Sequence, residues 1–132
     1  LVVGGIFAIS RQKTDIETIK IGVSAPHTGP VAIIGERAVE GMRLAVDELN
    51  TSGGIKGKQV SLVVEDDKCN AKEGTNTINK LINIDKVPVL VVYCGAVAGA
   101  APEIVQGKAL TFSISVRTES LENKYPLFIN PI

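Results

Sequence analysis

The sequence predicts an α/β fold, a doubly wound and mostly parallel sheet with helices on both faces. Short apolar runs alternate with stretches of helical periodicity along most of the chain. The run 87–92 is continuously apolar, which is typical of a strand covered on both faces. Gly, Pro and Asn separate these segments. Strands that alternate with helices at this spacing favour parallel pairing through crossover connections.

The first predicted unit is a strand, a turn and a long helix between Ile19 and Gly57. Apolar residues alternate with Lys or Gly in the strand, and a turn rich in Gly and Pro follows. We expect the helix to start near Gly35 and to stop at Gly53 and Gly54, which supply a positive φ. Its apolar face consists of Val39, Met42, Val46 and Leu49.

The remaining elements follow the same alternation. Further strands are predicted at 59–64, 87–92, 110–114 and 127–129. Asn70 and Glu73 form a capping-box pattern at the start of the second helix. That helix should turn Ile78, Leu81 and Ile82 inward. A helix of small residues is predicted over 95–106, where Pro102 either kinks it or starts a fresh turn.

Composition excludes several classes of partner. The chain has 132 residues, enough for one domain with a real core. Lys plus Arg and Asp plus Glu both number 14, so no net charge attracts the chain to nucleic acid or acidic lipid. Aromatic residues make up 4% and Trp is absent, which argues against base-stacking surfaces for nucleic acid.

The N-terminal segment 1–18 has the character of a targeting sequence. Its first ten residues are apolar and uncharged, and Arg11 and Lys13 follow. A bilayer span needs about 20 residues, so this run alone is too short. We expect 1–18 to be the end of a signal peptide or of an N-terminal membrane anchor, plus a linker. An extra buried strand is the alternative.

The motifs of common enzymes are missing. No Gly-rich nucleotide loop and no nucleophile elbow occurs. The carboxylates at 65–67 resemble those of a phospho-receiver domain, but no acidic residue follows the strand at 87–92. We therefore interpret 65–67 as a solvated strand end and His27 as a loop residue rather than a base. The sequence predicts neither an enzyme nor a cofactor.

The two cysteines follow neighbouring predicted strands. Cys69 and Cys94 should both lie at the carboxyl edge of the sheet. An even cysteine count in an exported chain favours a disulfide, and two free thiols are the alternative in a reducing compartment. A metal site is disfavoured because His27 is the single histidine and there is no third cysteine.

Several motifs, in order and at matching spacing, resemble one known family. They are Thr28-Gly29-Pro30-Val31, the helix start at Gly35, the turn at 50–57 and the acidic run 65–67. This pattern resembles the first part of the branched-chain amino-acid-binding proteins of bacterial ABC transporters, which have the type I periplasmic binding fold. The resemblance implies that 19–132 is the first lobe of a solute-binding domain whose second lobe is absent from this chain. It also implies a bridge between Cys69 and Cys94.

The resemblance further implies a ligand site in a cleft between two lobes. The loops 26–35, 94–97 and 113–118 would line the first-lobe side, with backbone amides and hydroxyls around the ligand's carboxylate. The corresponding positions in this chain are Ile34, Gly95, Ala96, Ser115 and Arg117. The family usually has Ser at 95, Thr at 117 and an aromatic residue at 34, so a leucine-type specificity is not implied. The alternative is that Ser115 and Arg117 are ordinary surface residues.

We therefore expect an extracytoplasmic solute-binding component of an ABC transporter. Its ligand would be an amino acid or a related small amide, and its partner an ABC permease. The protein would be periplasmic or on the cell surface, with contact to the membrane only through its N-terminal segment. The alternative is the ligand-sensing extracellular domain of a membrane receptor with the same fold.

Overall fold

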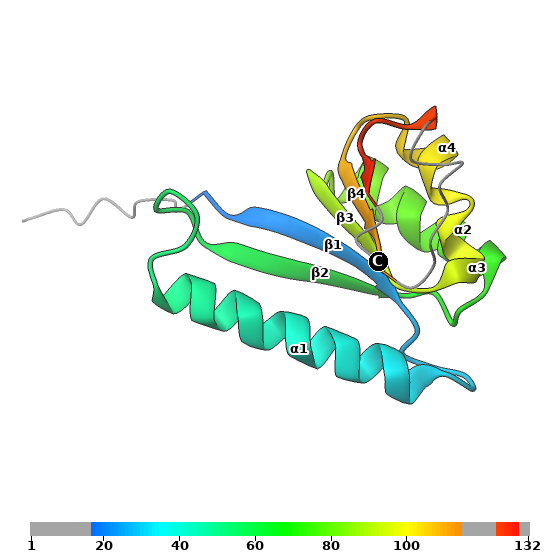
Figure 1. Ribbon diagram of the computed structural model, residues 1–132, viewed down its shortest axis with the longest axis horizontal. Coiled ribbons are helices and arrows are strands. Elements are labelled where there is room, and N and C mark those ends of the chain that lie inside the picture. Colours follow the sequence, from blue (N-terminus) through cyan, green and yellow to red (C-terminus); the bar gives the residue numbers. More distant parts are fainter. Residues whose placement is uncertain (1–16, 115–123, 130–132) are drawn as a thin grey trace, which may run out of the picture.

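The computed structural model describes residues 17–114 and 124–129, and shows a single sheet of five parallel strands (Figure 1). Their spatial order is β2-β1-β3-β4-β5. This confirms the predicted parallel α/β sheet. The strands are β1 (Ile19–Ala25), β2 (Val60–Asp66), β3 (Val89–Val92), β4 (Leu110–Ser113) and β5 (Phe128–Ile129).

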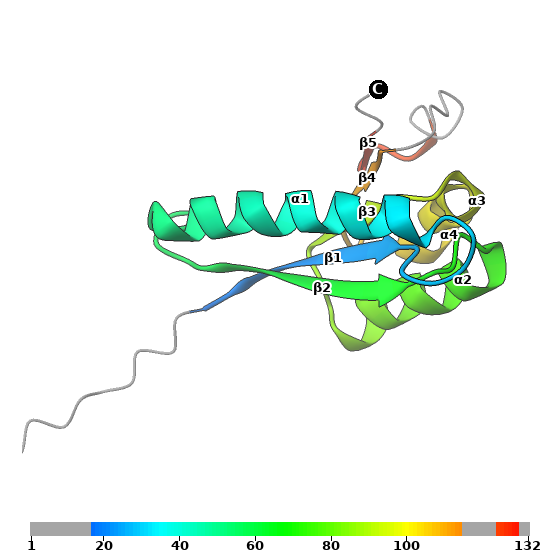
Figure 2. The same ribbon diagram turned by 90° about the horizontal axis from the view of Figure 1, so that it is seen from below.

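Helices cover both faces of the sheet, as predicted. The long helix α1 lies along one face, over β1 and β2, and the shorter helices lie on the other (Figures 1 and 2). The order of the strands therefore reverses at β1, which pairs with β2 on one side and β3 on the other. The helices are α1 (Ala32–Thr51), α2 (Ala71–Asn79), the π-helix η1 (Lys80–Ile84), α3 (Gly95–Ala98) and α4 (Ala101–Val105).

The larger part of the core lies between the sheet and the shorter helices. There the fully buried Ile78 and Leu81 pack in one cluster with Leu90, Val92 and Val97. The smaller cluster under α1 contains Val23, Ala25 and Val39. The predicted inward face of the second helix is thus confirmed.

The face of the sheet that carries α1 is less completely covered. Leu90 and Val92 are buried, but Val89 and Val91, which point to the opposite face of the same strand, are only half-buried. The prediction that 87–92 is covered on both faces is therefore only partly right. The reason is that α1 packs mainly against β1 and β2, so that Val91 of β3 reaches the cluster under α1 only as a partly buried residue.

The long helix α1 begins at Ala32, three residues before its predicted start near Gly35, whereas the signals at two other helix ends have the predicted effects. The Asn70 side chain accepts hydrogen bonds from the backbone N–H groups of Lys72 (2.9 Å) and Glu73 (3.3 Å), which confirms the N-cap. The predicted helix over 95–106 is divided into α3 and α4, with Pro102 in the first turn of α4. Pro102 therefore starts a fresh helix, one of the two predicted outcomes, since it lacks the N–H that a helix interior needs.

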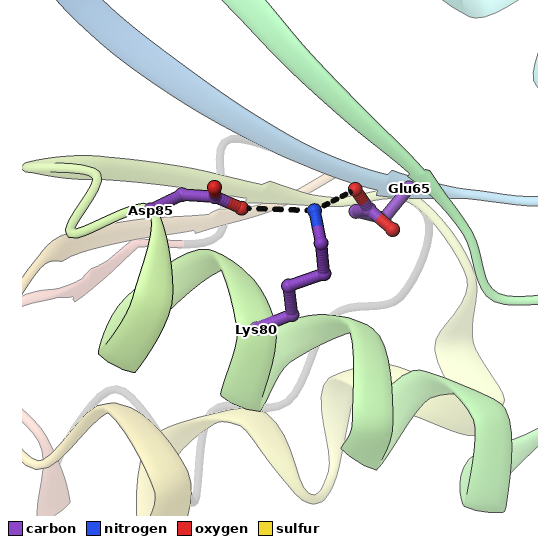
Figure 3. Close-up of polar contacts among 3 residues, drawn as sticks. All are labelled: Glu65, Lys80 and Asp85. Atoms are coloured by element: carbon purple, nitrogen blue, oxygen red, sulfur yellow. Dashed lines mark hydrogen bonds and ion pairs between the residues drawn. The ribbon is translucent and has the colours of Figure 1, made fainter.

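An ion-paired lysine joins η1 to the end of β2. Lys80 Nζ lies 2.5 Å from Glu65 Oε1 and 3.2 Å from Asp85 Oδ2 (Figure 3). The hydrogen bonds that Lys80 donates to both carboxylates raise its pKa. Glu65 is therefore paired, and not simply solvated as the sequence indicated.

The start of α1 packs so closely against the chain after β1 that it requires glycine. A Cβ on Gly35 would lie 2.0 Å from the backbone oxygen of Pro26, whereas one on Gly41 would meet nothing within 4 Å. We predict that Gly35→Ala lowers the free energy of unfolding by about 2 to 3 kcal/mol, because backbone must move. Gly41→Ala should raise it by about 0.5 to 1 kcal/mol, because alanine is the better helix former. Urea unfolding of both variants measures this, and equal effects would contradict the close contact.

Candidate functional site

A concave cavity of about 270 Å³ opens where the order of the strands reverses. The connections after β1 and β3 leave this point towards opposite faces of the sheet, and open α/β sheets bind ligands at such points. Side chains from the loop after β1, the turn after β2 and the loop after β3 meet here. The cavity is lined by Pro26, Val31, Ile34, Cys69, Tyr93, Cys94 and Gly95.

The loop after β1 is held by one carboxylate at the end of β2. Asp66 Oδ1 accepts hydrogen bonds from the backbone N–H groups of His27 (2.8 Å), Thr28 (3.3 Å) and Lys68 (3.0 Å). Its Oδ2 accepts one from the Thr28 hydroxyl at 2.6 Å. Burial opposes ionisation of Asp66, but these four bonds outweigh it and lower its pKa to about 2. Asp66 is therefore a carboxylate throughout the physiological pH range.

The next residue, Asp67, is fully buried. Its Oδ2 accepts a hydrogen bond from the Ser24 hydroxyl of β1 at 2.8 Å, and its Oδ1 accepts one from the backbone N–H of Cys69 at 2.8 Å. The Ser24 hydroxyl also lies 2.9 Å from that of Thr77 on α2. Burial raises the pKa of Asp67, and the bonds from Cys69 and Ser24 oppose this.

These contacts correct the interpretation of 65–67 as a solvated strand end. β2 runs to Asp66, two residues beyond its predicted end, so the acidic run lies within and directly after the strand. All three carboxylates have partners from other elements. Sequence patterns could not show this, because the partners from other elements lie between 15 and 43 residues away in the chain.

A disulfide joins Cys69 to Cys94, with their Cα atoms 5.4 Å apart. This confirms the predicted bridge. Lys68 and Cys69 both have left-handed backbone conformations, with φ of 51° and 52°, so the turn after β2 is tight. The bridge connects this turn to the loop after β3 and forms part of the cavity wall.

The structure describes three of the five predicted ligand residues. Ile34 and Gly95 line the cavity, but Ala96 is exposed and does not. Ser115 and Arg117 lie outside the described residues. Because α3 has only four residues, its dipole is weaker than that of the long helix expected at this position.

Other residues of the cavity were not predicted as ligand residues. Tyr93 precedes Cys94 at the end of an apolar run, and Val31 belongs to the Thr-Gly-Pro-Val motif of the first loop. Asp66 does not line the cavity, but it binds the loop that does. The signal in the sequence that could have pointed to Asp66 was its position at the end of a strand.

The chemistry of the cavity suits a small solute with an apolar part. Its walls are mainly hydrocarbon, aromatic and disulfide surface, with backbone at Gly95. His27 has a buried Nε2 without a hydrogen-bond partner among the residues that the structure describes. In residues 17–114 and 124–129 no cluster of three potential metal ligands occurs. No helix in these ranges is long and apolar enough to cross a membrane.

Comparison with known proteins identifies similar chains. Residues 18–130 match the family model described as "Periplasmic binding protein". An "Amino acid binding protein" of Pseudomonas aeruginosa is 32% identical over 105 residues, which is 79% of this chain and 28% of that protein. The "Leu/Ile/Val-binding protein" of Escherichia coli is 32% identical over 94 residues, which is 71% of this chain and 26% of that protein.

The fold is similar to that of a solved amino-acid complex. The structure of the branched-chain amino acid transporter substrate binding protein of Streptococcus pneumoniae in complex with isoleucine aligns with a TM-score of 0.77 and 32% identity. The alignment covers 86% of this chain and 33% of that one. The chain thus spans about a third or less of the length of these relatives.

The disulfide should contribute measurably to stability. The bridged residues are 25 apart, and closing a loop of this length stabilises the folded state by about 3 kcal/mol in the chain-entropy model. We predict that replacing Cys69 and Cys94 together by Ala lowers the free energy of unfolding by that amount in urea. Adding a reductant should bring the wild type to the stability of the double variant and leave the variant unchanged. A wild type no more stable than the double variant would contradict this.

Acid should weaken the Asp66 contacts. The pKa of Asp66 is about 2 in the folded protein against a usual 3.8, so its contribution to stability is present above pH 4 and is lost as pH falls towards 2. With an allowance for partial exposure of the carboxylate to water, we expect a loss of about 1 kcal/mol. In unfolding measurements between pH 5 and 2.5, Asp66→Asn should lose less stability than the wild type. Parallel curves for the two proteins would show that Asp66 makes no net contribution.

Proposed function

Since the chain belongs to the periplasmic binding protein family, we propose that it is the first lobe of an exported solute-binding protein. This protein delivers an amino acid or a related small amide to an ABC permease and catalyses no reaction. The family is extracytoplasmic and binds substrates for transport. Supporting this proposal, the relatives quoted above bind amino acids according to their names.

The single observation that carries the proposal is the cavity at the switch point between β1 and β3. It is open on one side, has apolar walls and is bounded by backbone at Gly95. Every amino acid has a charged carboxylate, which needs hydrogen-bond donors, and many amino acids have an apolar side chain, which needs an apolar wall. The cavity supplies the wall, and the loops after β3 and β4 are the proposed source of the donors.

Two lobes are part of this proposal. Residues 19–132 form the first lobe, and a second lobe closes over the ligand from the opposite side of the cleft. The match covers 28% of the length of the P. aeruginosa protein, which leaves room in such a protein for a lobe of similar size. For residues 1–18 we propose the end of a signal peptide or of a membrane anchor.

The proposed ligand contacts are those that the resemblance to the family implies. The backbone N–H groups of Gly95 and Ala96 and the side chains of Ser115 and Arg117 hold the carboxylate. Ile34 forms an aliphatic wall where related proteins have an aromatic one, and its side chain is accessible because the residue is 51% exposed.

Substitution of Arg117 tests whether this side chain binds the carboxylate of the ligand. We predict that Arg117→Ala in the two-lobe protein weakens binding of its amino-acid ligand at least tenfold, because a bidentate charged pair is lost. Arg117→Lys should not restore the affinity fully, because an ammonium group lacks the planar fork of a guanidinium. Isothermal titration with the twenty standard L-amino acids measures both variants.

Arg43→Ala is the matched control. Arg43 is exposed on α1 and does not line the cavity, so its loss should leave affinity unchanged. If Arg117→Ala also leaves affinity unchanged, the carboxylate binds to the Gly95 and Ala96 amides instead. If none of the amino acids binds the wild type, the proposed function is wrong.

A further inference from the structure

We propose that Asp66 is a positioning residue for the ligand site: it holds the loop after β1 in the conformation that forms one wall of the cavity. The effect on ligand binding rests on the proposed function. The statement that Asp66 holds the loop rests only on the hydrogen bonds of Asp66. Nothing in the chemistry of the acidic run suggests direct contact with ligand. Its effect on binding would be transmitted through the loop 26–34.

Asp66 links the end of β2 to the loop that follows β1. Asp66 is the last residue of β2 and pairs with Ala25, the last residue of β1. Directly beyond this pair, its carboxylate receives the N–H groups of His27 and Thr28 and the Thr28 hydroxyl. Asp66 therefore continues the contact between β2 and the chain after β1 beyond the point where regular strand pairing ends.

The loop after β1 is fixed from two sides. Asp66 binds it at His27 and Thr28, and the start of α1 packs against Pro26, where the backbone oxygen would lie 2.0 Å from a Cβ at Gly35. Pro26 directly precedes the residues held by Asp66, and Val31 and Ile34 lie between those residues and Gly35; all three line the cavity. Without the Asp66 contacts, the wall that these side chains form would lose its hydrogen bonds to the end of β2.

The carboxylate of Asp66 has no free position at which it could bind the ligand directly. Asp66 Oδ1 already accepts three N–H groups, and Oδ2 accepts a short bond from the Thr28 hydroxyl. A ligand's ammonium group would have to compete with these donors, and Asp66 does not line the cavity. Because the charge is committed to the protein's own backbone, the residue positions the wall and leaves recognition to other groups.

The test compares Asp66→Asn and Asp66→Ala in the two-lobe protein. The amide oxygen of Asn can still accept N–H groups, but it lacks the charge, so binding should weaken about threefold to tenfold. Ala removes every acceptor and should weaken binding at least thirtyfold. The probe is whichever of the twenty standard L-amino acids binds the wild type most tightly by isothermal titration.

Two controls separate positioning from loss of charge or stability. Glu65→Gln removes one negative charge from the adjacent residue, which pairs with Lys80 and does not line the cavity, so its affinity should match that of the wild type. Leu81→Ala destabilises the core by removing a fully buried side chain, and at a temperature where it stays folded it should also bind normally. Unchanged affinity in both Asp66 variants would overturn the proposal.

A second readout needs no ligand. Hydrogen–deuterium exchange of the His27 and Thr28 amides should become at least tenfold faster in Asp66→Ala than in the wild type, and should not change in Glu65→Gln. If no amino acid binds the wild type, the proposed function fails and this comparison still decides whether Asp66 holds the loop. Exchange at wild-type rates in Asp66→Ala would show that it does not.

Discussion

The structure depends on the position of β1 between β2 and β3. β1 pairs in parallel with both, so that Val23 lies beside Val64 on one side and Val91 on the other. With β1 in the centre, the connection to β2 through α1 and the connection to β3 through α2 must cover opposite faces. The chain therefore separates at the carboxyl ends of β1 and β3, and the cavity occupies the gap between the two loops.

The end of β2 supplies the contacts that shape this gap, although no residue of β2 itself lines it. Asp66 binds the loop after β1, Asp67 binds the turn that carries Cys69, and the disulfide ties that turn to the loop after β3. The three consecutive acidic residues thus have different sets of partners, since the third, Glu65, pairs with Lys80. Adjacent carboxylates normally repel each other, and here the donors around Asp66 and the burial of Asp67 move their pKa values in opposite directions.

The two faces of the sheet differ in how completely they are packed. The face under α2, α3 and α4 has a continuous buried core, whereas the face under α1 is closed only over β1 and β2. The end of α1 that lies near the cavity also exposes Ile33 and Ile34 by more than half. An exposed aliphatic surface beside a ligand cavity is consistent with a site that a second lobe completes.

The sequence by itself determined the order and type of most elements. These features follow from local signals: apolar periodicity for the strands, Asn70 for a helix start, and Pro102 for a break between α3 and α4. A resemblance carried by several short motifs pointed to Ile34, Gly95 and Ala96 as ligand residues. In the structure Ile34 and Gly95 line the cavity, and Ala96 does not.

Only the tertiary structure decided what the acidic run contacts and which further residues line the cavity. Asp66 and Asp67 resembled a solvated strand end in the sequence. Their distant partners lie on β1 and in the loop after it, and they become apparent only when β1 and β2 are placed side by side. The partial exposure of β3 could not be predicted from the sequence either, because the apolar pattern of a strand does not indicate which helix covers it. Hydrogen bonds and burial between residues about 40 apart depend on topology, and a periodic pattern in one segment carries no information about its neighbours in space.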